Sequence, residues 1–266
     1  EQKGECIMIQ QLWRRITGSL QVKTTLLIVG IMIVLLAVFI LYDVQTQRQV
    51  LEQALRQKGE SLALSGAMTI GQVLEDAIAS GRLTEAGVFD TNFLPIPGTN
   101  PQKYHTAYDS FADAHFLKVQ DAYLEGSDVL YAVAVSVSGY VPTHNTRYAR
   151  PLTGDYATDL AGNRTKRIFD DEVGLKAVKH TQRILQQVYH RDTGEVAWDI
   201  SAPIWVNGKH WGGFRVGFSL VSVNAASAVA TRRILFAASC LVIAIGVVAL
   251  LIARSITRPI LALRDM

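Results

Sequence analysis

Two long stretches without a charged side chain constrain the fold of this protein more than any other feature of its sequence. They cover residues 24–42 and 234–253 and consist mainly of leucine, isoleucine, valine and alanine. Each has about 20 residues and measures roughly 30 Å as a helix, the thickness of the hydrocarbon core of a bilayer. A helix that is apolar on every side needs a large core or a membrane around it, and 266 residues provide no such core. The sequence therefore predicts two transmembrane helices.

Lysine and arginine residues near these stretches predict their orientation, because cytoplasmic segments carry an excess of them. We expect a cytoplasmic N-terminal segment (1–23), a first span (24–42), an extracytoplasmic domain (43–233), a second span (234–253) and a cytoplasmic tail (254–266). The alternative for the first stretch is a cleaved signal peptide, but its apolar core is longer than usual and no small-x-small site follows it. The basic residues that flank the outer ends are Arg14, Arg15, Lys23, Arg254, Arg258 and Arg264.

Composition excludes several classes of protein. Only 18% of the residues are charged, against about 25% in soluble domains, and the net charge is +3. This balance argues against a nucleic-acid-binding protein, and 49% hydrophobic residues argue against intrinsic disorder. The two cysteines, Cys6 and Cys240, lie outside the extracytoplasmic segment, so we expect neither a disulfide nor a Cys-x-x-Cys-His haem attachment there.

The extracytoplasmic segment is long enough for one folded domain with a substantial core. Apolar residues at helical spacing predict a long helix over 44–80. A second, aromatic-faced helix is expected from Tyr104 to about 124, and a third over 173–188. Strands are predicted over 128–137, from Tyr140, and over 195–206, where Asn207-Gly208 indicates a type I′ hairpin with a return strand. The predicted fold class is α+β, with a small antiparallel sheet.

The last residues of the chain resemble the opening of a HAMP domain. The sequence Arg254-Ser-Ile-Thr-Arg-Pro-Ile-Leu-Ala-Leu-Arg-Asp-Met266 follows a predicted span, and Pro259 matches the signature proline. The resemblance implies that Ile260 and Leu263 are core positions of a parallel four-helix coiled coil in a homodimer, with Pro259 in signal transmission. The alternative is an ordinary basic helix next to the membrane.

Three motifs of the outer segment resemble the PAS-like Cache sensor domains of methyl-accepting chemotaxis proteins. They are Gly139-Tyr-Val-Pro-Thr-His-Asn145, Gly162-Asn-Arg-Thr-Lys-Arg-Ile168 and Ser201-Ala-Pro-Ile-Trp-Val-Asn-Gly-Lys-His-Trp-Gly-Gly-Phe-Arg-Val-Gly217. The resemblance implies a single Cache domain with a long N-terminal helix, a ligand pocket on one face of its sheet, and a dimer. It also implies a multi-pass protein of a bacterial inner membrane.

Candidate ligand-binding residues follow from side-chain chemistry. Arginines in residues 147–183 suit carboxylates, and if they point inward they favour an anionic metabolite as the ligand. The alternative is a solvated surface, because runs of charged residues usually face water. Residues 140–145 place an aromatic ring, an imidazole and an amide beyond a strand, although the last two are equally suited to hydrogen-bonding loop backbone. Asp199 and Arg215 share a strand face and are expected to pair. The candidate set is Tyr140, His144, Asn145, Arg147, Arg164, Arg167, Trp198, Asp199 and Arg215.

No catalytic motif is found, so we expect no enzymatic activity. The six histidines form no ligand pair such as His-x-x-x-His, and no cofactor or metal is expected. Haem bound through a single histidine is an alternative, with His115 as the candidate.

The predicted function is the sensory half of a transmembrane chemoreceptor. A small extracytoplasmic ligand would act through the second span on a HAMP domain and a cytoplasmic module, with a cytoplasmic adaptor and a histidine kinase as partners. Homodimerisation and contact with membrane lipid are expected, and nucleic-acid binding is not. The alternatives are the sensory part of a histidine kinase or diguanylate cyclase, and a membrane-anchored binding protein without signalling output.

Overall fold

The computed structural model describes residues 20–124, 129–219, 228–248 and 251. It divides into two compact units, one comprising residues 1–50 and 226–266 and the other residues 51–225. The predicted N-terminal segment lies mostly outside the described residues, as do Pro259 and the rest of the HAMP-like tail.

The first unit contains two apolar helices of membrane-spanning length. Helix α2 runs from Leu20 to Ala79 and includes the first apolar stretch. The second apolar helix covers Ala228–Val248. Their most apolar windows have mean hydropathies of 2.2 and 1.9, and neither window has a buried residue within the described part of the chain. Both predicted stretches therefore form helices whose apolar side chains require a nonaqueous environment.

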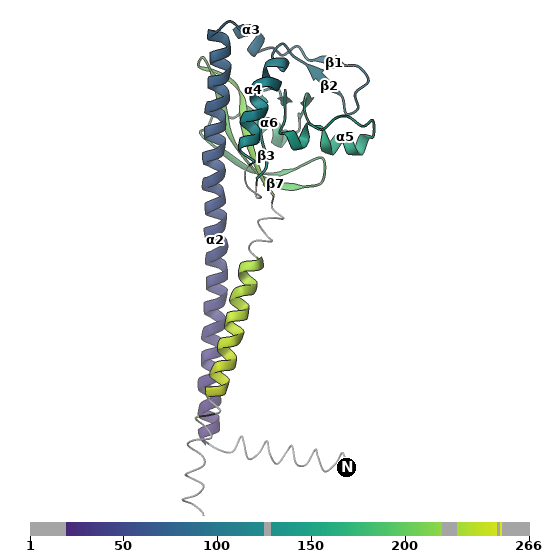
Figure 1. The fold of residues 1–266 in the computed structure, drawn as a ribbon. Coiled ribbons are helices and arrows are strands. Elements are labelled where there is room, and N and C mark those ends of the chain that lie inside the picture. The colour runs from purple at the N-terminus through teal and green to yellow at the C-terminus, as the bar shows by residue number, and fades with distance from the viewer. Residues whose placement is uncertain (1–19, 125–128, 220–227, 249–250, 252–266) are drawn as a thin grey trace, which may run out of the picture. The chain divides into compact units, whose positions relative to one another are not determined.

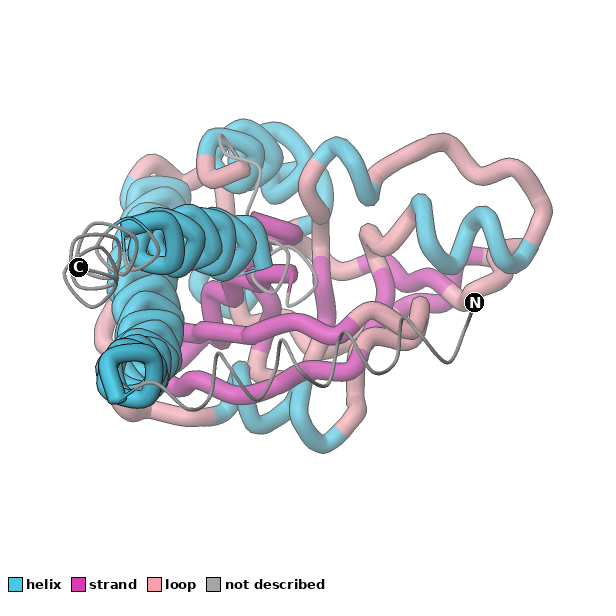
Figure 2. The backbone as a smooth tube through the Cα atoms, turned by 90° about the horizontal axis from the view of Figure 1, so that it is seen from below, coloured by secondary structure: helices cyan, strands magenta, loops and turns pink. Residues whose placement is uncertain are grey.

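The second unit is built on a four-stranded antiparallel sheet in the order β3-β8-β7-β6. Figures 1 and 2 show these strands side by side, which confirms the α+β class and the antiparallel sheet. Two smaller sheets pair β1 with β2 and β4 with β5. The strands are β1 (Leu94–Ile96), β2 (Lys103–His105), β3 (Val129–Ser136), β4 (Tyr140–Val141), β5 (Arg167–Ile168), β6 (Leu185–His190), β7 (Val196–Val206) and β8 (Lys209–Ser219). The shorter helices are α3 (Glu85–Val88), α4 (Asp109–Ala122), η1 (Thr146–Tyr148), α5 (Tyr156–Gly162) and α6 (Glu172–Lys179).

Helices cover both faces of the four-stranded sheet. One face packs against α2 and α4 in a cluster that includes Ile70, Phe116 and Phe214. The other face packs against α6 and β4 in a smaller cluster that includes Tyr131, Val133 and Val178. The larger cluster supplies most of the apolar core, while the smaller one shares its face with buried charged residues.

Glycines allow the predicted long helix to lie close to the sheet. Helix α2 ends at Ala79, as expected, and Gly81 follows with a φ of +70°. A methyl group at Gly66 would overlap the buried ring of Phe214, and one at Gly71 would lie 2.6 Å from the carbonyl oxygen of Trp205. These glycines weaken the helix locally, but they permit a close approach that larger residues would prevent.

The predicted hairpin is confirmed, and two of the predicted helices need correction. Asn207 and Gly208 both have positive φ, as a type I′ turn between β7 and β8 requires. The predicted helix over 173–188 is wrong in its second half, since α6 ends at Lys179 and β6 pairs with the edge of β7. Similarly, Tyr104 lies in β2 rather than in a helix, because β2 pairs with β1 and the Tyr104 N–H donates to the carbonyl of Lys166 (2.8 Å).

Close packing of α2 on β8 makes a prediction for stability. Replacing Gly66→Leu should lower the free energy of unfolding by about 2–3 kcal/mol, because the new side chain has no space beside Phe214. Met68→Leu is the matched control on an exposed face of the same helix and should change it by less than about 0.5 kcal/mol. Urea unfolding of the full chain in detergent micelles, followed by tryptophan fluorescence, measures both. Equal stability of the two variants would contradict the packing described here.

Candidate functional site

A small cavity lies on the face of the sheet that packs against α6 and β4. Its volume is about 30 Å³. Its polar lining comprises Arg164, Arg191, Arg215 and His144, all of them buried. The remaining lining is aromatic or aliphatic: Tyr131, Val133, Val135, Val141, Phe169 and Tyr189. Three guanidinium groups and one imidazole around an otherwise apolar space make this the candidate ligand site.

The predicted pair of Asp199 and Arg215 forms a buried ion pair at the base of the cavity. The guanidinium donates from Nε to both carboxylate oxygens (3.1 and 3.2 Å) and from Nη2 to Oδ2 (3.0 Å). Tyr131 also donates its hydroxyl to Asp199 (2.8 Å), and Gln187 donates its amide (3.1 Å). Burial lowers the pKa of Arg215, but the Asp199 carboxylate outweighs this effect and the pKa is raised overall. The pair is therefore ionised, as a buried pair with additional hydrogen bonds can be.

Arg164 and Arg167 share one carboxylate partner and one aromatic ring. Asp192 accepts from Arg164 (2.7 Å) and from Arg167 (3.0 Å). Both guanidinium groups lie 4.8 Å from the centroid of the Phe169 ring, a distance suited to a cation–π contact. Burial raises the pKa of Asp192, but the two arginines hold it below its ordinary value. Arg164 lines the cavity, whereas Arg167 contributes a nearby positive charge.

Arg191 is a lining residue whose guanidinium group is only partly hydrogen-bonded. Its Nη1 pairs with Glu195 and donates to the hydroxyl of Tyr148 (3.3 Å). Its Nη2 is buried and has no hydrogen-bond partner among the described residues. The guanidinium also lies over the rings of Tyr131 (5.6 Å) and Tyr148 (4.8 Å). A buried, unsatisfied N–H of a charged group is costly, so Nη2 is the clearest ligand-binding donor of the cavity.

His144 and Asn145 have different roles although they are neighbours in sequence. Nδ1 of His144 accepts from the backbone N–H of Asn145 (2.8 Å). Burial and then the surrounding arginines lower the pKa of His144 well below its ordinary value, so the ring is neutral and carries its proton on Nε2. Asn145 instead accepts from the N–H of Ala132 (3.0 Å) and does not line the cavity.

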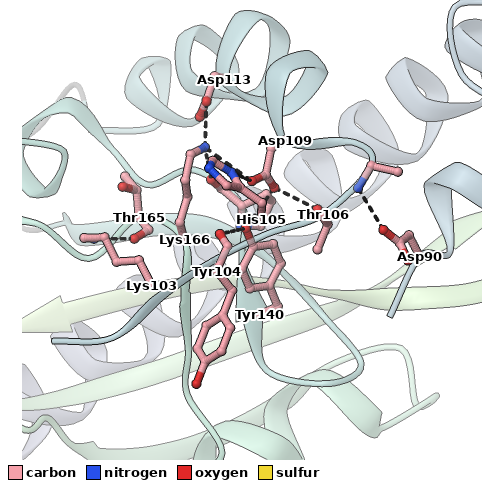
Figure 3. A network of polar contacts seen from close by, with 12 residues as sticks. Asp90, Lys103, Tyr104, His105, Thr106, Asp109, Asp113, Tyr140, Thr165 and Lys166 are labelled. Carbon is pink, nitrogen blue, oxygen red and sulfur yellow. Dashed lines mark hydrogen bonds and ion pairs between the residues drawn. The ribbon is translucent and has the colours of Figure 1, made fainter. Parts of the chain in front are cut away.

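Tyr140 belongs to a separate polar network under α4 (Figure 3). Its hydroxyl lies 2.8 Å from Asp109 Oδ1 and 2.9 Å from the carbonyl oxygen of Tyr104. Asp109 also accepts from Thr106 (2.7 Å) and lies 3.7 Å from Lys166 Nζ. This network joins β2, β4 and α4 and so supports the loop that carries His144.

The other predicted site residues lie away from the cavity lining. Arg147 is exposed and donates weakly to the carbonyl of Leu130 (3.4 Å). Trp198 packs against the larger core cluster on the other side of the sheet. No group of three or more histidine, cysteine, aspartate or glutamate residues suited to a metal ion occurs within the described ranges. His115 contacts the ring of Phe111 (4.2 Å between centroids) and does not line the cavity.

The cavity contains residues that the sequence did not indicate. Tyr131, Phe169, Tyr189 and Arg191 were not candidates, although each lines the space. Tyr189 lies in β6 and Arg191 follows that strand, whereas the sequence predicted a helix up to residue 188 and no strand here. The sequence Leu-Gln-Gln-Val-Tyr-His of this strand does not alternate between apolar and polar residues, so it carried no clear strand signal.

Comparison with known proteins gives little further information. Neither a protein-family model nor a curated protein matches this chain. Among solved structures, one titled "Crystal Structure of the E.coli DcuS Sensor Domain" is 19% identical, with a TM-score of 0.31, over 41% of this chain and 70% of that one. A likeness of this size carries no argument about fold or function, which rest on the residues described above.

The buried ion pair makes a prediction about charge. Asp199→Ala should lower the free energy of unfolding by about 3–5 kcal/mol, because it leaves Arg215 buried without its carboxylate. The double variant Asp199→Leu with Arg215→Met should recover most of this loss, since an apolar pair of similar volume needs no compensating charge. Urea unfolding of the full chain measures both changes. A single variant that costs less than the double variant would contradict the pairing.

Lys103 makes a prediction about pH. It is buried, and its ammonium donates to Asn163 Oδ1 (2.7 Å) and to the carbonyl of Thr165 (2.6 Å). Burial, followed by the charges of Arg167 and Lys166, lowers its pKa from 10.5 to about 8. The folded chain therefore releases this proton at lower pH than the unfolded chain, and Lys103 favours folding increasingly as pH rises from about 8 to 10.5.

Thermal melts of the wild type and Lys103→Met between pH 7 and pH 10 measure this effect. The melting temperature of the wild type should rise relative to that of the variant as pH increases. Parallel pH profiles would show that Lys103 titrates normally in the folded chain.

Proposed function

We propose that this chain is the sensory half of a transmembrane chemoreceptor, with a PAS-like Cache domain outside the cytoplasm that binds a small anion. The observation that carries the proposal is the cavity lined by the buried side chains of Arg164, Arg191 and Arg215. A domain that only had to be stable would not need three guanidinium groups around a space, because each buried charge loses hydration. The domain of residues 51–225 also connects in sequence to an apolar helix of membrane-spanning length on each side.

Cavity residues come from segments far apart in the chain, which supports a role in signalling. Tyr131 belongs to β3, Arg164 precedes β5, and Arg215 belongs to β8. A ligand that contacts all three segments stabilises the arrangement in which they lie closest together, and so shifts the population of conformations. Strand β8 ends at Ser219, shortly before the second apolar helix begins at Ala228. Strand β8 is therefore the part of the sheet from which a movement has the shortest path along the chain to the second span and to the HAMP-like segment after it.

The proposed arrangement places the receptor in a bacterial inner membrane as a homodimer, with an adaptor and a histidine kinase in the cytoplasm. A sensor histidine kinase or a diguanylate cyclase would use the same outer domain, and the output module decides between them.

A hybrid receptor tests the signalling role. The 266 residues would be joined to the remaining HAMP and signalling modules of a characterised chemoreceptor, and the activity of the coupled kinase would be measured. Acetate, succinate and phosphate are the probes, each added from outside. At least one of them should change kinase activity, because differential binding shifts the signalling equilibrium. Arg183→Met, which removes an exposed arginine away from the cavity lining, is the control and should keep the response.

Labelling of intact cells locates the cavity-containing domain. With Cys6 and Cys240 replaced by serine, Ala157→Cys on the exposed side of α5 should react with a membrane-impermeant thiol reagent. Gln10→Cys, in the predicted cytoplasmic segment, should react only after permeabilisation. The opposite pattern would place the domain in the cytoplasm and would refute the receptor.

A further inference from the structure

The unpaired hydrogen-bond donors of the cavity restrict the choice of ligand more than its positive charge does. The four guanidinium groups of this region, Arg164, Arg167, Arg191 and Arg215, pair with only three carboxylates, those of Asp192, Glu195 and Asp199. Arg164 and Arg215 already have carboxylate partners at hydrogen-bond distance. Nη2 of Arg191 is a fully buried guanidinium nitrogen that lacks a hydrogen-bond partner among the described residues. The site therefore has an unsatisfied guanidinium donor for an anionic group.

A second donor lies in the same lining. The neutral ring of His144 accepts at Nδ1 from the Asn145 N–H, which leaves the Nε2 proton for a ligand. One donor on an arginine and one on a histidine match the two oxygens of a single carboxylate.

The remaining lining is apolar. Val133 and Val135 project from β3, Val141 from β4, and the ring of Phe169 follows β5. These side chains have no polar atoms, so the part of the ligand that contacts them must be apolar. An ammonium or hydroxyl group there would lose its hydration without a replacement.

The volume limits the length of the aliphatic part. A cavity of about 30 Å³ exceeds the roughly 10–15 Å³ that a single water needs on this measure, and it holds two or three such waters. Acetate and propionate, with four and five non-hydrogen atoms, are the smallest carboxylates that have an alkyl end. The enclosed space therefore favours a short alkyl chain at the buried end of the ligand.

We infer that the ligand of this cavity is a short-chain aliphatic monocarboxylate, with its carboxylate on Arg191 Nη2 and His144 Nε2 and its alkyl end among Val133, Val135 and Val141. This inference rests on the proposed function, because it names the ligand class of the same site. Arg191 becomes the principal ligand-binding residue, and Arg164 and Arg215 supply positive potential while remaining bound to their own carboxylates.

Isothermal titration of the purified full chain in detergent micelles tests the inference. The probes are acetate, propionate, butyrate, succinate, phosphate and propionamide, a neutral molecule of the same shape as propionate. Acetate and propionate should bind, whereas succinate, phosphate and propionamide should not. Arg191→Met should weaken the binding of propionate by about 10- to 100-fold, the fold-change expected for loss of a hydrogen bond to a charged group. Arg183→Met should leave the binding unchanged.

A second variant keeps the test decisive if Arg191→Met does not fold. Val135→Ala enlarges the apolar end and should shift the preference from propionate toward butyrate while Arg191 remains. An unchanged order of affinities for acetate, propionate and butyrate would show that the alkyl chain does not contact Val135, and would overturn the inference.

The outcomes separate the ligand class from the receptor function. Binding of succinate or phosphate in place of monocarboxylates would refute the inferred ligand and leave the proposed receptor intact. If no anion binds and the hybrid receptor responds to none of them, both proposals fail.

Discussion

The buried ion pair of Arg215 and Asp199 is the interaction on which this side of the sheet depends. A charge inside a sheet is tolerated only with a partner and further hydrogen bonds, and Asp199 receives them from Arg215, Tyr131 and Gln187. Gly213 and Gly217 flank Arg215 on the same strand, where an added methyl would meet the Ala177 backbone (2.8 Å) or the Tyr131 ring. The absence of side chains at these two positions lets α6 and Tyr131 reach the pair. The cavity lies next to this ion pair, with Arg215 as part of its lining.

The two faces of the sheet are stabilised by different interactions. The face toward α2 and α4 is a continuous apolar cluster in which glycines of α2 let the helix lie against Ile200 and Phe214. Burial of such side chains contributes roughly 1.5–3 kcal/mol each, so this face supplies most of the stability. The opposite face combines a small apolar cluster with ion pairs that contribute little net stability. A domain with a sufficient core on one face can keep polar groups for binding on the other.

Parts of this arrangement were predictable from sequence because they depend on local chemistry. Asn207-Gly208 specifies its turn because both residues readily adopt positive φ. Side chains alternate between the two faces along each strand, and this alternation placed Asp199 and Arg215 on the same face and predicted their pairing. Arg191 was not predictable in the same way. Its position depends on β6, and residues 185–188 of that strand were predicted as the end of a helix over 173–188. Once β6 is known to pair with β7, Tyr189 and Arg191 reach the cavity from the sheet edge.

The position of Arg191 also explains why a ligand would affect more than the cavity. Its guanidinium bonds to Glu195 across the turn between β6 and β7, and it lies over Tyr131 of β3 and Tyr148 of η1. One side chain thus contacts the edge of the sheet, its opposite edge strand and the loop after His144. A carboxylate on Nη2 would add a hydrogen bond at the point where these segments meet, beside the Nη1 that Glu195 already occupies. Since close packing transmits small displacements, tightening this contact would change how β6, β7 and β8 pack together, and β8 is the strand that leads toward the second apolar helix.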